Sequence, residues 1–280
     1  MTEPDGVRNL AAKEALLHGI LRELGRVAVA LSGGVDSSYL LAAAVSALGP
    51  ERVLALTAES PFFPGDEAEL SRRIAASLGV EHRMLPVDDL ANPQVASNPV
   101  DRCYHCKRAR FELLRDLAAE SDGAMLVHGE NADDHLQYRP GSAAAREVGA
   151  RAPLAEAGLG KAEIRTLARR AGLPNWDRPA AACLATRFPY DTPLTREGLA
   201  RVEGAERFLH DLLGTSALRV RDHYPIARLE LAPEDIPRAA QDPLRRQISE
   251  GLTARGYRYV TLDLDGYRSG SFDDRVANQS

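Results

Sequence analysis

Aromatic residues and basic charge are both scarce in this sequence of 280 residues. Aromatic side chains make up 5%, and 35 Lys and Arg residues are outnumbered by 40 Asp and Glu residues, which gives a formal net charge of −5. Proteins that bind nucleic acid as their main partner usually carry a basic surface, and those that bind single strands add aromatic stacking platforms. We therefore do not expect nucleic acid to be the partner of this chain.

The sequence also has no apolar run close to the roughly 18 to 20 residues needed to cross a membrane. The stretch MTEPDGVRNL at 1–10 is acidic and has no hydrophobic core of the kind found in secretory signals. Three cysteines are too few, and odd in number, for the disulfide framework of a secreted fold. We expect a cytoplasmic protein with no membrane partner.

Apolar runs alternate with amphipathic helical patterns in the first part of the chain. The predicted strands are 27–31, 53–58, 82–87 and 125–129. The predicted helices are 8–24, 36–48, 66–78 and 105–120. Strands that alternate with helices indicate an α/β fold with a parallel sheet.

The pattern changes after residue 178. The predicted order there is helix 195–213, strands 217–223 and 226–232, helix 234–254 and strand 257–264. This order is typical of a small α+β domain. We predict two domains, 1–178 and 179–280, joined by a Pro- and Ala-rich ordered linker at 178–195.

The motif SGGVDSS at 32–38 lies between the first strand and its helix. Two glycines allow the backbone to approach an anion, and a helix N-terminus offers free N–H groups and a positive dipole end. The lysine of the Walker motif is absent, and so is the dinucleotide pattern GxGxxG. The motif therefore predicts a pyrophosphate cradle, and it resembles the signature of the PP-loop ATP pyrophosphatases (adenine nucleotide alpha hydrolase-like enzymes). The residues expected to bind ATP in this motif are Ser32, Gly33, Gly34, Asp36, Ser37 and Ser38, and Asp36 could also hold Mg²⁺.

The motif GENADD at 129–134 follows the fourth strand, so Asp133 and Asp134 should lie at the carboxyl edge of the sheet. Alone it would be equally well explained as an acidic helix start. Beside SGGVDSS, we expect these two carboxylates to contribute to the ATP–Mg²⁺ site. The pair His128 and Glu130 matches the H-x-E of zinc deaminases, but here the CxxC precedes it, so we reject a deaminase.

Cys103 and Cys106 form a CxxC, and Cys183 lies far along the chain. Three thiolates with one open position suit an iron–sulfur cluster. A zinc site would need a fourth ligand such as His105 or His128, and three unrelated buried thiols are the simplest alternative.

The third cysteine makes the resemblance specific. RPAAACLATRFPYDTPLT at 178–195 resembles the cysteine motif of the LarE family of ATP-dependent sulfurtransferases. RPG at 139–141, GARAPL at 149–154, VRDHYPIARLE at 220–230 and GYRSGSFDD at 266–274 are similar to the same family. The similarity extends over nearly the whole chain.

This resemblance implies that ATP adenylates the carboxylates of pyridinium-3,5-biscarboxylic acid mononucleotide, and that sulfur then displaces AMP to give thiocarboxylates for the nickel-pincer nucleotide. Asp36 and Cys183 would be the catalytic residues. The family has two sulfur routes: a sacrificial one that converts the motif cysteine to dehydroalanine, and one with a reloadable 4Fe–4S cluster on three cysteines. Because Cys103, Cys106 and Cys183 are all present, the resemblance favours the cluster and a separate sulfide source.

The resemblance also assigns residues of the second domain to substrate. Arg219 and Arg221 alternate along a strand and so share a face, which by pattern alone would be a solvated face. A nucleotide phosphate needs a cationic clamp, so we expect both to bind it. Arg187 is expected at the substrate carboxylate, and Glu230 is a weaker candidate that could equally be a surface carboxylate. We expect this domain to mediate homo-oligomerisation. The alternatives are a PP-loop tRNA thiolation enzyme, an ammonia-using synthetase of the same fold, and a nucleotide-binding module that senses ATP without turnover.

Overall fold

The computed structural model describes residues 5–136, 140–179, 183–215 and 217–268. Parts of three motifs quoted above, at 139, 180–182 and 269–274, lie outside the described residues. Contacts within the chain separate it into two compact units. Unit 1 comprises 1–88 and 101–181, and unit 2 comprises 89–100 and 182–280. The excursion of 89–100 into unit 2 was not expected from the sequence.

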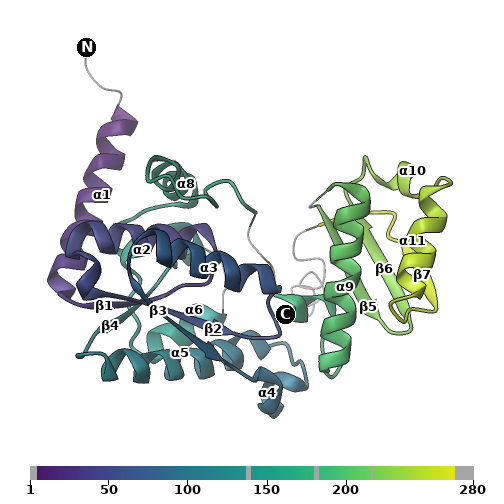
Figure 1. Ribbon diagram of the computed structural model, residues 1–280, viewed down its shortest axis with the longest axis horizontal. Coiled ribbons are helices and arrows are strands. Elements are labelled where there is room, and N and C mark those ends of the chain that lie inside the picture. Colours follow the sequence, from purple (N-terminus) through teal and green to yellow (C-terminus); the bar gives the residue numbers. More distant parts are fainter. Residues whose placement is uncertain (1–4, 137–139, 180–182, 216, 269–280) are drawn as a thin grey trace. The chain divides into compact units, whose positions relative to one another are not determined.

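Unit 1 is built on a parallel sheet (Figure 1). Its strands are β1 (Val27–Ala30), β2 (Val53–Glu59), β3 (Glu81–Pro86) and β4 (Met125–His128). They are ordered β3-β2-β1-β4, and each pairing is parallel. The predicted α/β class with a parallel sheet is therefore confirmed.

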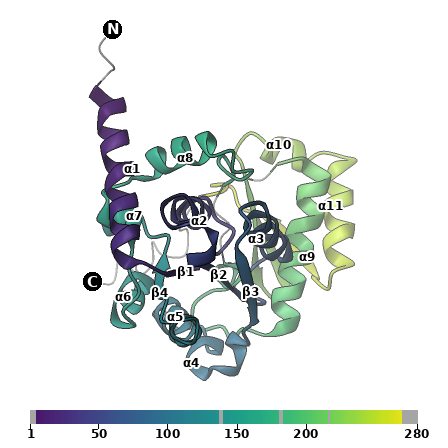
Figure 2. The ribbon, with the colours of Figure 1, turned by 60° about the vertical axis from the view of Figure 1, so that its left-hand side comes forward.

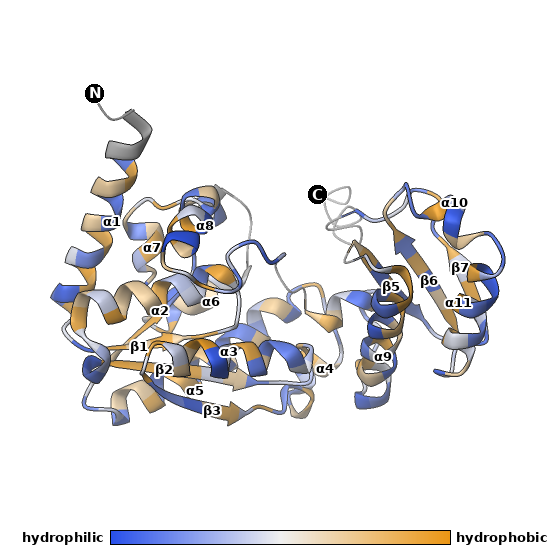
Figure 3. Cartoon of the chain, turned by 45° about the horizontal axis from the view of Figure 1, so that its top comes forward, coloured by the Kyte–Doolittle hydropathy of each residue, from blue (hydrophilic) through white to orange (hydrophobic). Residues whose placement is uncertain are grey.

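Both faces of this sheet are covered, which is why its central strands are mainly apolar. Strands β1 and β2 have the hydrophobic colour in Figure 3. Because successive side chains point to opposite faces, Val27 and Val29 enter one core cluster, while Ala28 and Leu54 enter another. The edge strand β3 instead exposes Glu81 and Arg83, and such charges discourage pairing with a further strand.

Helices cover the two faces as separate layers (Figure 2). The helices of the first layer are α1 (Asp5–Leu24), α2 (Val35–Leu48), α3 (Gly65–Ser77), α7 (Pro153–Glu156) and α8 (Lys161–Arg170). The second layer has α5 (Arg102–Glu120) and α6 (Pro140–Glu147). Short 3₁₀ turns are η1 (Pro50–Arg52) and η3 (Ala132–Leu136).

Unit 2 contains a separate three-stranded sheet in the order β5-β6-β7. Its strands are β5 (Leu218–His223), β6 (Ile226–Leu231) and β7 (Tyr259–Leu262). Strand β6 is antiparallel to β5 and parallel to β7. The other elements of this unit are η2 (Asp89–Ala91), α4 (Pro93–Ala96), η4 (Leu184–Arg187), α9 (Arg196–Leu213), α10 (Ile236–Ala239) and α11 (Leu244–Thr253). The predicted α+β character of this region is confirmed.

The pairing of β5 with β6 divides the sheet of unit 2 into two chemically different faces. Residues opposite each other across the pair share a face. One face carries Leu218, Val220, Leu229 and Leu231, which pack with α9 and α11 in the core of the unit. The other, called the charged face below, carries Arg219, Arg221, Arg228 and Glu230.

The single helix predicted over 234–254 is wrong. The structure has the short helix α10 and then α11, which begins after Pro243. Proline has no N–H to donate within a helix and disfavours the helical conformation of the residue before it, here Asp242. No helix in the described part of the chain is long and apolar enough to cross a membrane.

Candidate nucleotide site

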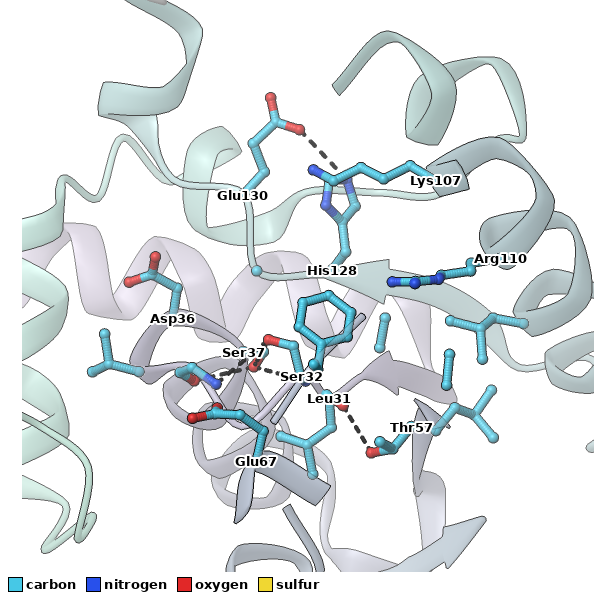
Figure 4. A pocket seen from close by; sticks show the side chains of 18 of the residues that line it. Leu31, Ser32, Asp36, Ser37, Thr57, Glu67, Lys107, Arg110, His128 and Glu130 are labelled. Carbon is cyan, nitrogen blue, oxygen red and sulfur yellow. Dashed lines mark hydrogen bonds and ion pairs between the residues drawn. The ribbon is translucent and has the colours of Figure 1, made fainter. Parts of the chain in front are cut away.

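The strand order of the unit 1 sheet reverses between β1 and β4. The chain adds β2 and β3 on one side of β1, and β4 then pairs with its other side. Open parallel sheets bind ligands in the crevice at the carboxyl ends of the strands beside such a reversal. A cavity of about 400 Å³ lies here, and the residues that line it belong to unit 1 (Figure 4). It is called the sheet cavity below.

The structure divides the predicted ATP-binding residues into two groups. Those that line the sheet cavity are Ser32, Gly34, Asp36, Ser37 and Asp134. Gly33, Ser38 and Asp133 are not lining residues, and they hold the surrounding loops in place. The predicted motifs therefore meet at one site, but only part of each faces the cavity.

The hydroxyl of Ser37 organises the loop between β1 and α2. It accepts a hydrogen bond from the Ser32 N–H at 3.2 Å, lies 3.1 Å from the Ser32 hydroxyl and donates to the Gly34 carbonyl at 3.1 Å. Gly34 is the N-cap of α2 and has no side chain to cap the helix. The first N–H groups of α2 are thus available to an anion, and the helix dipole favours one there.

Gly33 adopts a backbone conformation that favours glycine, with φ of +81°. A Cβ atom at this position would lie 2.9 Å from the Glu67 carbonyl oxygen, so the loop passes directly against α3. The Gly33 carbonyl accepts a hydrogen bond of 2.7 Å from the buried Asn175 side chain. The same amide donates to the Ser38 hydroxyl at 3.0 Å. Asn175 therefore ties the loop to a distant segment of unit 1.

Asp36 is the carboxylate most affected by burial in this cavity. Desolvation raises the pKa of Asp36, while Lys161, whose Nζ lies 3.9 Å from the carboxylate, and a hydrogen bond from Asn131 act in the opposite direction. The Asp36 Oδ1 atom is buried and has no hydrogen-bond partner among the described residues. A buried carboxylate oxygen left unpaired is a suitable ligand for Mg²⁺.

Asn131 holds the GENADD loop in shape. Its side-chain oxygen accepts from the N–H groups of Asp133 and Asp134 at 3.0 and 3.2 Å. Asp133 turns away to cap α8, where its carboxylate accepts from the Lys161 N–H at 2.7 Å. Asp134 remains at the cavity, and its charge also raises the pKa of Asp36. Asp36 and Asp134 could hold Mg²⁺ together with ATP phosphates, because Mg²⁺ commonly needs only one or two protein carboxylates.

A basic helix forms another part of the cavity lining. Lys107 and Arg110 from α5 point into the cavity in Figure 4, where His128 and Glu130 also appear. The His128 Nε2 atom lies 3.7 Å from a Glu130 carboxylate oxygen, and both side chains are buried. This H-x-E pair is thus an internal ion pair when His128 is protonated.

Cys103 and Cys106 lie in the first turns of α5, while Cys183 belongs to unit 2 beside η4. Cys103 is exposed and accepts a hydrogen bond of 3.3 Å from Arg102, whereas Cys106 is buried. The described residues contain no group of three or more Cys, His, Asp or Glu placed to hold a metal ion, so an iron–sulfur cluster on these three cysteines stays a prediction.

The predicted substrate residues of unit 2 are mostly engaged in internal ion pairs. Arg187 makes a two-pronged contact with Glu206 at 2.9 and 2.8 Å, and both residues are buried. Arg221 donates to Glu230 at 2.8 Å and to the Thr186 carbonyl at 2.7 Å. Glu230 is fully buried, so its interpretation as a surface carboxylate is wrong.

Arg219 differs from its neighbours on the charged face. It donates to the Leu218 carbonyl and the Tyr267 hydroxyl, and its guanidinium lies 4.9 Å from the Tyr267 ring centre. No carboxylate of the described residues forms an ion pair with it. Burial, and then the adjacent Arg187 charge, lower the pKa of Arg219. An anion that paired with this guanidinium would relieve both effects.

Comparison with known proteins identifies the family. The family model for asparagine synthase matches residues 17–97, which include β1, the 32–38 loop and β2. A pyridinium-3,5-bisthiocarboxylic acid mononucleotide synthase from Lactiplantibacillus plantarum is 39% identical over 269 residues, covering 95% of this chain and 96% of the relative. The chain belongs to the LarE family. This confirms the predicted resemblance, the PP-loop fold and an ATP-dependent sulfurtransferase as the class of enzyme.

Two further similarities show the range of this LarE protein's relatives. An uncharacterised protein from Synechocystis is 40% identical over 264 residues, covering 94% of this chain and 98% of the relative. An NH₃-dependent NAD⁺ synthetase from Chlorobaculum tepidum is 31% identical over 166 residues, covering 57% of this chain and 58% of the relative. The match to the synthetase is partial, whereas the match to the Synechocystis protein covers almost the full length of both chains.

Several residues at the sheet cavity were missed by sequence reasoning. Lys161 and Arg165 from α8 line the cavity, and Asn175 supports its loop. Nothing in their local pattern distinguishes them from ordinary helix or turn residues. Asn131 could have been found, because an Asn two residues before a helix-like acidic pair commonly bonds the following N–H groups.

Proposed function

We propose that this LarE protein uses ATP to convert the carboxylates of pyridinium-3,5-biscarboxylic acid mononucleotide into thiocarboxylates, a step toward the nickel-pincer nucleotide. The observation that carries the proposal is the nearly full-length similarity to the Lactiplantibacillus plantarum synthase of the bisthiocarboxylic product. The sheet cavity supports the proposal, because its 32–38 loop has N–H and hydroxyl groups suited to pyrophosphate and its buried Asp36 carboxylate is suited to Mg²⁺.

The first half of the reaction is adenylation. A substrate carboxylate oxygen attacks the α-phosphorus of ATP, the bond from that phosphorus to the bridging oxygen breaks, and pyrophosphate leaves. Ser32, Gly34 and the first turn of α2 would hold the departing pyrophosphate through hydroxyl and N–H groups. Asp36 and Asp134 would hold Mg²⁺, which supplies positive charge to the phosphate oxygens when bound. Lys161, whose Nζ lies 3.9 Å from the Asp36 carboxylate, would add positive charge beside the phosphates.

The second half is transfer of sulfur. A sulfur nucleophile attacks the carbonyl carbon of the acyl adenylate, the bond to AMP breaks, and one oxygen of the substrate has been exchanged for sulfur. We propose that Cys103, Cys106 and Cys183 hold a 4Fe–4S cluster, which when bound would carry an additional sulfide to this step. A separate sulfide source would restore it. Sacrifice of the Cys183 sulfur is the alternative.

The phosphate of the substrate is proposed to bind the charged face of unit 2. Arg219 is the best candidate, because its guanidinium is half-buried and has no carboxylate partner among the described residues. Arg221 would add positive charge while remaining paired with Glu230. Arg187, which remains paired with Glu206, is proposed to contact a substrate carboxylate. Under this proposal, unit 2 acts as the substrate-binding part of the protein; its role in homo-oligomerisation remains a prediction.

The reaction is tested by incubating the protein with ATP, Mg²⁺, sulfide and the pyridinium biscarboxylic mononucleotide. We expect AMP, pyrophosphate and a product that gains mass by one oxygen-to-sulfur exchange per step. Asp36→Ala should abolish product through loss of the metal ligand. ADP and phosphate as products would contradict the assigned cradle, and thiolation of tRNA in place of the pyridinium would contradict the proposed substrate.

The sulfur route is tested on the protein itself after turnover. A reloadable cluster predicts iron and visible absorbance in anaerobically purified protein, loss of both in each Cys→Ser variant, and an unchanged mass at Cys183. Sacrifice predicts dehydroalanine at position 183, lighter by one H₂S, and a single event per protein. Stoichiometric dehydroalanine would overturn the cluster while leaving the enzyme class in place.

A further inference from the structure

Helix α5 brings cations and thiols together at the sheet cavity. Lys107 and Arg110 line the cavity and point into it in Figure 4. Cys103 lies four residues before Lys107, and Cys106 lies four residues before Arg110. Residues four apart on a helix lie on the same face, one turn above each other. Each cysteine is therefore followed by a cation on its own side of the helix.

The side chain of Lys107 is held by its packing against α6. A Cβ atom added to Gly141 would lie only 2.2 Å from the Lys107 Cδ atom, so the lysine stem rests directly on the glycine backbone. The ammonium group of Lys107 has no acidic partner in the part of the chain that the structure describes. A cation oriented into a cavity without a partner is suited to an anionic ligand.

Arg110 is held by different contacts. Its Nη2 group donates to the Ser60 hydroxyl at 2.8 Å, and its guanidinium lies 4.9 Å from the Phe63 ring centre. Ser60 and Phe63 follow β2, so the arginine joins α5 to the loop at the carboxyl end of that strand. The aromatic ring helps to orient the guanidinium, whose planar set of N–H donors matches a planar anion such as a carboxylate.

The phosphates of ATP have a separate partner in this cavity. The 32–38 loop and the start of α2 offer N–H and hydroxyl groups to them, and the carboxylates of Asp36 and Asp134 require a cation there. Lys107 and Arg110 come from a different helix of the opposite layer. A second anion, distinct from the polyphosphate, best accounts for their positions.

We propose that Lys107 and Arg110 bind the substrate carboxylate that becomes adenylated, and hold it one helical turn from the cysteines of α5. This inference rests on the proposed function and deepens it by naming a carboxylate subsite within unit 1. The two cations neutralise the carboxylate during binding. After adenylation the carbonyl carbon would lie near the sulfur-bearing end of the same helix.

Steady-state kinetics of Lys107→Met tests this inference, with the pyridinium biscarboxylic mononucleotide and ATP varied separately. Loss of one charged hydrogen bond should raise KM for the pyridinium substrate on the order of tenfold to a hundredfold. The dissociation constant for a non-cleavable ATP analogue should change by less than about twofold. Lys107→Arg should recover most of the loss, because it restores the charge.

Arg108→Met is the matched control. Arg108 lies on the same helix but is half-exposed and paired with Glu112, so the same change of charge there should leave both constants as in the wild type. Weaker binding of the ATP analogue by Lys107→Met would assign the lysine to phosphate and overturn the inference. If the wild type thiolates the pyridinium and Lys107→Met does so with an unchanged KM, the inference is overturned while the proposed function stands. A wild type that never thiolates the pyridinium would overturn the proposed function, and this inference with it.

Discussion

Replacing Gly33 by alanine tests whether the loop at the start of α2 is held against α3. The added Cβ would lie 2.9 Å from both the Glu67 carbonyl and a Glu67 carboxylate oxygen, and 3.2 Å from the Ser71 hydroxyl. A backbone oxygen cannot rotate away as a side chain can. The loop itself must therefore shift, and the N–H groups that we propose to bind pyrophosphate shift with it.

The expected loss of stability in Gly33→Ala has two causes, an unfavourable backbone conformation and overpacking. Gly49→Ala serves as a control that has only the first. Gly49 has the same φ of +81°, but a Cβ there would meet no atom within 4 Å. Gly49→Ala should destabilise unit 1 by about 1–3 kcal/mol, because its φ of 81° and ψ of 152° lie in a region that essentially only glycine adopts. Gly33→Ala has a backbone cost of a similar order for its positive φ, and overpacking adds about 1–3 kcal/mol. Its total should be about 2–6 kcal/mol.

The single tryptophan of the chain provides the assay. Trp176 packs against the core of unit 1, with Arg169 over its ring, so its fluorescence follows unfolding of this unit. Urea unfolding of both variants gives the two free energies, and pyrophosphate release gives the activities. Gly33→Ala should lose nearly all activity while Gly49→Ala keeps it. Equal destabilisation by the two substitutions would refute the proposed contact with Glu67.

Three further predictions concern buried polar groups. Glu206→Ala should destabilise unit 2 by about 3 kcal/mol, since it leaves the Arg187 guanidinium buried without its partner; hydrogen exchange of β5 unchanged from the wild type would contradict this. Asn175→Asp should raise KM for ATP at neutral pH, because a carboxylate then faces the Gly33 carbonyl, and lower pH should restore binding; a pH-independent KM argues against this role. Burial raises the pKa of Asp36, so the folded protein holds this proton more tightly than the unfolded chain. Its contribution to stability should therefore decline as pH rises from the ordinary Asp range through the raised pKa, and Asp36→Asn should remove that dependence in metal-free unfolding titrations.

The sheet of unit 1 could be predicted because its signals are local. Apolar runs such as 27–31, bounded by turn residues and amphipathic helices, specify strands that are buried on both faces. SGGVDSS and GENADD follow two such strands, and parallel strands place their carboxyl ends at one edge. The meeting of Asp36 with Asp134 follows from this rule.

What could not be predicted depends on contacts between distant segments. Asn175 reaches Gly33 across 142 positions, and no periodic pattern encodes that hydrogen bond. Arg219 and Arg221 were correctly expected to lie on the same face of β5. The pairing of Arg221 with Glu230 and of Arg187 with Glu206 was not foreseen, because the sequence does not show which residue of another element will face a given side chain.

The passage of residues 89–100 into unit 2 has a consequence for the order in which the chain folds during synthesis. Two backbone hydrogen bonds hold this segment: Leu194 N–H donates to the Ala96 carbonyl at 2.7 Å, and Asp191 N–H donates to the Asn98 carbonyl at 2.9 Å. The ribosome releases 89–100 long before those partners exist. Unit 1 can fold while residues 89–100 remain an unpaired loop. Translation must pass residue 194 before both of these hydrogen bonds can form. A fragment ending at residue 181 would expose Val95, which is otherwise 1% exposed, and should be cleaved by protease within 89–100 sooner than the whole chain.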